Sequence, residues 1–108
     1  MNESIFLRVF GDAPYLRVLD FFLNYPDFDY SKTHVAREAG VSRITIEGIW
    51  SKLVKEKILV GTRELGRARL FKLNRGNQLV EKLLKIDYEL STTDAKSLSE
   101  RKLALVKA

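Results

Sequence analysis

Few side chains in this sequence have the types and spacing that catalysis or metal binding requires. His34 is the single histidine, and the sequence contains no cysteine. A lone imidazole without cysteines or clustered carboxylates makes a poor metal site, so we expect no metal or other cofactor and a surface or capping role for His34. Asp27 and Asp29 lie close together, but carboxylates so near each other in a loop usually shape turns. Because no nucleophile and base are paired, we predict that the protein is not an enzyme.

The basic side chains are concentrated in one stretch, and their chemistry is the binding of anions. The net charge is +5 at pH 7. Residues 1–42 carry a net −2, residues 43–75 carry nine basic and three acidic side chains for a net +6, and residues 76–108 carry a net +1. Such a local excess is typical of a surface that meets a nucleic-acid backbone. A solvated, lysine-rich surface is the alternative interpretation of the charge alone.

Residues 33–49 have the spacing of two helices joined by a tight turn. The second helix would begin where the basic stretch begins, so its first turn would carry part of the positive charge. Ala36 is small where the two helices approach each other, and Gly40 stands where the backbone leaves the first helix with a left-handed angle. Ser42 is a suitable N-cap for the second helix. Apolar residues at helical spacing would hold the motif to the core and leave the intervening side chains outside. These core residues are Val41, Ile46 and Ile49.

The length and composition indicate the class of protein that carries this motif. A chain of 108 residues with 45% hydrophobic and 31% charged residues fits one globular domain. No apolar run approaches the ~20 residues that a membrane span needs, and no basic leader precedes the N-terminal apolar stretch. We therefore expect a cytoplasmic protein without a membrane partner.

Apolar periodicity predicts the elements before the motif. Residues 5–10 favour β structure, so we predict a short strand or extended arm. Asp12 would cap a first helix that stops before Pro26. Residues 27–30 would connect it to a second helix, which Ser31 caps.

The elements after the motif are predicted in the same way. The third helix frays near Lys57, and Trp50 lies on its apolar face, so we place the indole in the core. Residues 58–64 and 68–73 predict a β-hairpin around a Leu65-Gly66-Arg67 turn, although the alternation leaves its buried face open.

A fourth helix should follow the hairpin. It would begin at Gly76 or Asn77 and run to about residue 90. The Ser91-Thr92-Thr93 cluster should break it, leaving residues 91–108 as a short helix capped by Thr93 or a mobile tail.

At these positions the sequence resembles winged helix-turn-helix transcription regulators, especially small archaeal members related to the multiple-antibiotic-resistance and arsenical-resistance regulator groups. The resemblance covers about residues 12–90. It implies a mainly α fold with a small β-hairpin (α+β), with residues 1–90 as the domain, including the N-terminal arm and fourth helix. The segments that carry it are residues 36–42, 42–46, 53–60 and 66–74, together with 6–11 and 28–33.

The resemblance implies that the helix beginning near Ser42 enters the major groove of double-stranded DNA, while the hairpin, or wing, lies at the minor groove. Arg43 would bind a guanine edge or a phosphate, and Ile44 a thymine methyl group. The rest of the reading face would be Ser42, Glu47, Gly48 and Ser51. Further contacts, mainly to phosphates and the minor groove, would come from Lys32, Thr45, Lys52, Arg63, Arg67 and Arg69.

Two residues on this face depart from the family pattern. Glu47 can accept a hydrogen bond from cytosine N4 but repels phosphates, and Gly48 costs about 1 kcal/mol of helix stability relative to alanine. They leave open an alternative, a winged-helix interaction module that binds proteins in a transcription or chromosome complex without sequence-specific DNA binding.

The apolar surface of residues 79–90 is wider than one stripe. It could be intramolecular core or a dimer interface, and the N-terminal arm is a second candidate surface. We expect a homodimer that reads two half-sites and acts as a repressor by occluding a promoter.

Overall fold

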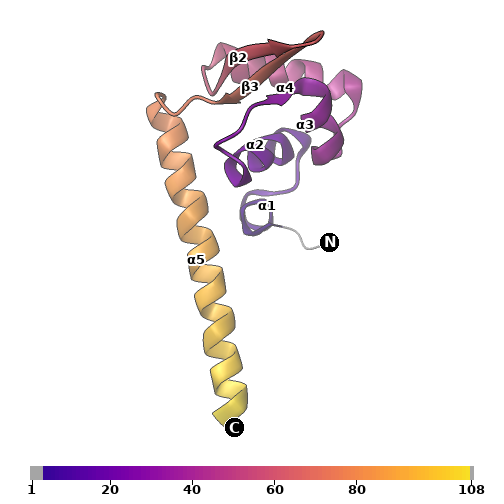
Figure 1. Ribbon diagram of the computed structural model, residues 1–108. Coiled ribbons are helices and arrows are strands. Elements are labelled where there is room, and N and C mark those ends of the chain that lie inside the picture. The colour runs from indigo at the N-terminus through magenta and orange to yellow at the C-terminus, as the bar shows by residue number, and fades with distance from the viewer. Residues whose placement is uncertain (1–3, 108) are drawn as a thin grey trace.

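The computed structural model describes the backbone of residues 4–107 and the side chains of residues 4–93. Figure 1 shows a compact group of helices with a small sheet at one end, and a long final helix that runs toward the opposite end. The predicted fold class, mainly α with a small β element, is confirmed. The elements in chain order are α1 (Ile5–Phe10), α2 (Pro14–Asn24), β1 (Tyr30–Ser31), α3 (Lys32–Ala39), α4 (Arg43–Lys55), β2 (Leu59–Leu65), β3 (Ala68–Leu73) and α5 (Gln78–Lys107).

One apolar core joins the helices to the sheet. Trp50 lies in it with 6% of its surface exposed, as the helical spacing predicts. Its ring centroid lies 5.8 Å from that of Phe22 and 5.4 Å from that of Phe71, so the indole bridges α2 and β3. The most deeply buried side chains come from α2, α3, α4, β3 and α5, and include Val18, Phe22, Val35, Leu53, Leu73 and Val80.

Residues 5–10 form the helix α1, so the predicted strand or extended arm is wrong. Ser4 caps the helix, because its Oγ accepts a hydrogen bond from the Leu7 amide at 3.1 Å. Phe6 is buried in the core, and α1 packs against α2 and α5. Tertiary packing and a side-chain cap therefore outweigh the β preference of these apolar residues.

The start of α2 also differs from the prediction. Ala13 occupies the N-cap position, without a side-chain hydrogen bond, and Pro14 opens the helix. Asp12 does not cap; its carboxylate lies 3.3 Å from Arg17 Nη1 instead. A proline at the first helical position has no amide to satisfy and a backbone angle suited to the helix, so this helix can start without the predicted cap.

The sheet has three antiparallel strands in the order β1-β3-β2, one more than the predicted hairpin. The segment predicted as a connector, residues 27–30, ends in β1. Tyr30 pairs with Phe71, and Ser31 pairs with Leu70. This strand holds the start of α3 beside the hairpin.

A bulge settles which residues of the hairpin are buried. Gly61 pairs with Phe71, but Arg63 pairs with Leu70, so Thr62 is an extra residue in β2. An extra residue bends and twists a strand locally. Leu70 and Leu73 are consequently both buried, although simple alternation places them on opposite faces.

Helix α5 is longer than predicted. Asn77 Oδ1 accepts a hydrogen bond from the Leu79 amide at 2.8 Å, so Asn77 caps the first turn. The helix then continues without a break to Lys107, and the predicted separate segment from residue 91 is wrong. Thr92 Oγ1 donates to the Tyr88 carbonyl at 2.9 Å, which satisfies this hydroxyl inside the helix. Ala108 lies outside the described residues.

None of the helices in residues 4–107 combines the length and apolar character needed to cross a membrane.

Candidate nucleic-acid interface

The predicted helix-turn-helix is confirmed in its details. Ser31 Oγ caps α3 by accepting from the His34 amide at 3.2 Å, and Ser42 Oγ caps α4 by accepting from the Thr45 amide at 3.1 Å. Gly40 is left-handed with φ of 67°, which glycine adopts without the Cβ clash of other residues. Val41 and Ile46 are buried between the helices, as predicted. These contacts fix where α4 begins.

The beginning of α4 projects its side chains into solvent. Ile44 is 88% exposed, which is unusual for a large apolar side chain in a helix and suits contact with an apolar group of a partner. The amides of this first turn have no partner four residues earlier, so the helix start is also suited to anions. The predicted contact residues of this helix that are exposed are Ser42, Arg43, Ile44, Thr45, Glu47, Gly48, Ser51 and Lys52.

Two of the predicted contact residues bind each other. Lys32 Nζ lies 2.9 Å from Glu47 Oε2 and joins the start of α3 to the exposed face of α4. The ammonium group partly neutralises the carboxylate that would otherwise repel phosphates. Glu47 is therefore electrostatically compatible with a face that approaches DNA.

Lys52 is held at the edge of α4. Its Nζ lies 5.2 Å from the centroid of the Tyr15 ring, over the aromatic face. Lys52 remains exposed, and this cation–π contact gives its flexible side chain a preferred direction.

The three arginines predicted for the wing (β2, β3 and their turn, Leu59–Leu73) have different surroundings. Arg63 is held by Asp29, with Nε 3.0 Å from Oδ2 and Nη2 3.3 Å from Oδ1. Hydrogen bonds from Arg63 and Thr62 lower the pKa of Asp29 below its usual range. Within residues 4–93, Arg67 and Arg69 make no ion pair, and Arg69 lies over the Phe71 ring at 5.7 Å. Arg67 and Arg69 are thus the arginines of the wing available to an anionic partner.

The side chains first considered for catalysis have structural partners. His34 stacks on Tyr30, with ring centroids 5.5 Å apart and an interplanar angle of 7°. Asp27 lies 3.4 Å from Arg75, and Asp29 binds Arg63. Asp29 thus ties the loop before β1 to β2, whereas Asp27 stays 75% exposed beside Arg75, as expected for a carboxylate in a turn.

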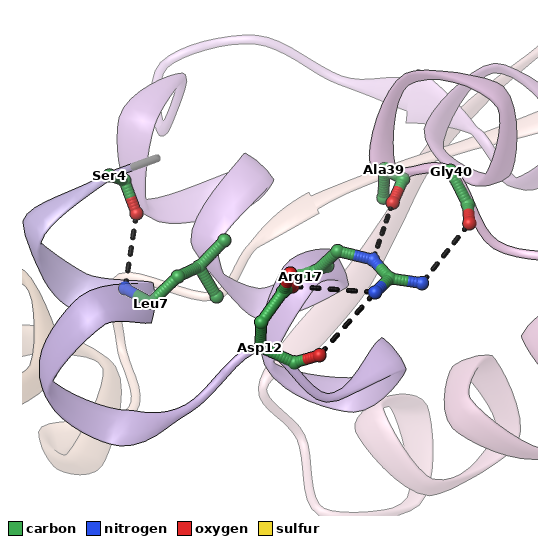
Figure 2. Close-up of polar contacts among 6 residues, drawn as sticks. All are labelled: Ser4, Leu7, Asp12, Arg17, Ala39 and Gly40. Atoms are coloured by element: carbon green, nitrogen blue, oxygen red, sulfur yellow. Dashed lines mark hydrogen bonds and ion pairs between the residues drawn. The ribbon is translucent and has the colours of Figure 1, made fainter. Parts of the chain in front are cut away.

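Sequence reasoning missed one residue beside the helix-turn-helix. Arg17 of α2 reaches the turn between α3 and α4, as Figure 2 shows, and its Nε donates to the Ala39 carbonyl at 2.9 Å. An arginine in an amphipathic helix gives no signal of such a contact, because only the fold brings residues 17 and 39 together.

Comparisons with known proteins support the fold. No protein-family model and no curated protein matches the sequence. Among solved structures, MepR, a transcription regulator of the Staphylococcus aureus multidrug efflux pump MepA, matches with a TM-score of 0.60 and 19% identity over 87% of this chain and 70% of its own. NadR, solved in complex with 4-hydroxyphenylacetate, matches with a TM-score of 0.59 and 20% identity over 95% of this chain and 75% of its own.

A third match names a family. NMB1585, a MarR family regulator from Neisseria meningitidis, has a TM-score of 0.53 and 16% identity over 85% of this chain and 60% of its own. The predicted resemblance is confirmed at the level of the fold. The chain has the winged helix-turn-helix fold of the MarR family regulators.

Proposed function

We propose that this protein is a transcription regulator that binds specific sequences in double-stranded DNA. The observation that carries the proposal is the exposed start of α4 next to a basic wing. Arg43, Arg67 and Arg69 are exposed, and none makes an ion pair within residues 4–93. Figure 1 shows the hairpin above α4 at the end of the molecule away from the end of α5. One surface can thus meet DNA with both elements.

In this proposal the first turn of α4 reads the major groove. An α-helix fits that groove, where each base pair presents a distinct pattern of donors, acceptors and methyl groups. Arg43 would bind a guanine edge, and the exposed Ile44 would contact a thymine methyl group. Arg67 and Arg69 would lie at the minor groove, while Lys32, Thr45 and Lys52 would bind phosphates.

A salt titration tests DNA binding directly. Fluorescence anisotropy with a labelled duplex would give the affinity of the purified protein between about 50 and 200 mM salt. Release of counterions predicts a linear fall of log affinity with log salt concentration. Absence of binding at the lowest salt concentration would contradict the proposal and favour the alternative of a protein interaction module.

We propose further that the protein acts as a homodimer through α5 and α1. Leu79 and Ile86 on α5, and Val9 and Phe10 on α1, are between 40% and 55% exposed. Helix α5 extends well beyond the packed domain (Figure 1), and a helix usually gains most of its stability by packing an apolar face. A second copy with its own α5 would cover this face.

Sedimentation would test the dimer. We expect a dimer at micromolar concentration, and Ile86→Glu should shift it toward monomer and weaken DNA binding, because two half-sites would no longer be bound together. Ser91→Glu, at an exposed position on the same helix, adds the same single negative charge and is the matched control. A wild-type monomer at these concentrations would contradict the proposed assembly.

Selection of bound sequences from random DNA would test specificity and symmetry together. A dimer with a two-fold axis should recover a palindrome with half-sites about one helical turn apart. Binding by occlusion alone would make the protein a repressor, so it should lower transcription in vitro from a promoter that overlaps the recovered site. Stimulation of that promoter would contradict the repressor role.

A further inference from the structure

Arg17 makes directed contacts with the turn that leads into α4, although it lies outside the proposed DNA-contacting surface (Figure 2). Nε donates to the Ala39 carbonyl at 2.9 Å, and Nη2 donates to the Gly40 carbonyl at 3.1 Å. Nη1 lies 3.3 Å from Asp12 Oδ1 and 3.4 Å from the Asp12 carbonyl. All three nitrogens of the guanidinium are therefore engaged, and its side chain is only 30% exposed.

The two carbonyls belong to the end of α3. Ala39 is the last residue of this helix, and Gly40 is its left-handed C-cap. The last carbonyls of a helix lack partners inside the helix and carry partial negative charge, so a guanidinium supplies both the missing donors and a favourable positive charge. Because the donors of arginine form a rigid planar fork, they also fix the relative direction of the two carbonyls.

The contacts of Arg17 lie a few residues before the exposed face of α4 that is proposed to read DNA. Helix α4 begins at Arg43, three residues after Gly40. The backbone hydrogen bonds of the turn, from the Gly40 and Val41 amides, run only to carbonyls of α3 itself. The buried side chains at the turn, Ala36 and Val41, make apolar contacts, which have no strong directional preference. Hydrogen bonds weaken steeply when they bend. The contacts of Arg17 are therefore the ones best suited to hold the angle between α2 and α4.

We propose that Arg17 is a positioning residue for sequence recognition, which sets the angle at which α4 enters the major groove. The inference rests on the proposed DNA binding and adds a division of roles to it. Contacts to base edges specify sequence and need accurate geometry, whereas phosphate contacts supply affinity on any sequence. Loss of the Arg17 contacts should therefore reduce discrimination between sequences and leave affinity for random DNA almost unchanged.

The test compares Arg17→Gln with Arg75→Gln. Both variants lose one positive charge, but Arg75 is paired with Asp27 and Glu81 outside the helix-turn-helix. Affinity would be measured at one salt concentration for the duplex selected by the wild type and for a random duplex, at a temperature where circular dichroism shows each variant folded. We expect Arg17→Gln to lower the ratio of the two affinities about tenfold, and Arg75→Gln to leave it unchanged. Arg17→Lys, which keeps the charge without the planar fork, should give an intermediate ratio.

An unchanged ratio of the two affinities in Arg17→Gln, whether both affinities fall equally or neither falls, would overturn the proposal. Amide hydrogen exchange provides a readout without DNA, because the Val41 amide donates to the Ala36 carbonyl at 2.8 Å within this turn. We expect faster exchange at Gly40 and Val41 in Arg17→Gln, with no change in Arg75→Gln. Unchanged exchange at both amides would also overturn the positioning role. Absence of wild-type DNA binding would instead reject the proposed function, whatever exchange shows.

Discussion

Lys32 and Glu47 form an ion pair of 2.9 Å that joins the first residue of α3 to the exposed face of α4. The pair explains how a carboxylate can lie on a surface suited to DNA. Lys32 was predicted to bind a phosphate, but its ammonium group lies against the carboxylate of a second predicted contact residue. Each side chain should therefore weaken the electrostatic effect of the other on DNA.

Substitutions of the two partners should change DNA affinity in opposite directions. Lys32→Gln removes a positive charge and leaves the Glu47 carboxylate without its partner, so affinity for any duplex should fall. Glu47→Gln should raise affinity for random DNA, because one source of repulsion is lost. Anisotropy at fixed salt measures both effects. A fall in random-DNA affinity for Glu47→Gln would contradict this interpretation.

The stability of these variants provides a control. The side chains are 38% and 59% exposed, and exposed ion pairs contribute about 0–1 kcal/mol. Thermal unfolding should therefore change little in either variant, so that differences in binding can be assigned to the surface.

Arginines at the two ends of the interface should differ in their effect on specificity. Arg43→Ala should cost about 1–3 kcal/mol on the selected sequence and change the preferred base at one position. Arg67→Ala combined with Arg69→Ala should weaken binding to all sequences and reduce the salt dependence. Selection from random DNA with each variant distinguishes these outcomes. A uniform loss from both substitutions would contradict the assigned roles.

The helix-turn-helix could be predicted from the sequence because local residues specify it. Ser31, Gly40 and Ser42 act on atoms within three or four residues of themselves, and their types report the backbone geometry directly. The buried position of Trp50 follows from helical spacing in the same way. These features do not depend on distant parts of the chain.

The errors arose where distant contacts decide the structure. Residues 5–10 are helical because Phe6 packs in the core and α1 contacts α2 and α5, which a β-favouring hexapeptide does not disclose. The two-residue strand β1 exists only because β3 offers a free edge. In the candidate site, the partners of Lys32 and Arg63 lie 15 and 34 residues away, so the sequence showed their charges but not their ion pairs.

Two glycines of the helix-turn-helix should respond to alanine in opposite directions. Gly40 has φ of 67°, so Gly40→Ala should destabilise the fold by about 1–2 kcal/mol. Gly48 lies inside α4 with open space where a Cβ would stand, so Gly48→Ala should stabilise it by about 1 kcal/mol. Chemical denaturation would measure both.

The Gly48→Ala variant also tests how closely the helix approaches DNA. Because Gly48 is on the proposed reading face, the added methyl group should weaken binding to the selected duplex even though the fold is more stable. Unchanged affinity would show that the backbone of α4 does not approach the groove at this residue.

Two carboxylates at the junction of α2 and α5 should make stability depend on pH. Asp20 is 7% exposed and accepts hydrogen bonds from Ser4 at 2.9 Å and Asn24 at 3.4 Å. Burial raises the pKa of Asp20, and burial together with the negative charge of Asp20 raises the pKa of Asp87. A carboxyl group with a raised pKa in the folded state favours unfolding when it is ionised. Its unfavourable effect is therefore present at neutral pH, declines as pH falls through the raised pKa, and vanishes below about 3.9.

Asp87→Asn should raise the unfolding temperature at pH 7, because it removes the charge of a group for which no hydrogen bond is described within residues 4–93. The gain should be a few degrees at pH 7 and smaller at pH 4, where the wild-type carboxyl is more protonated. Glu89→Gln, an exposed neighbour on α5, is the control for the loss of a negative charge. Asp29 has the opposite sign, since its lowered pKa gives stability that is lost as pH falls. Comparing each variant with the wild type at the same pH removes the contribution of Asp29. An equal gain in unfolding temperature for Asp87→Asn at both pH values would contradict the role of ionisation.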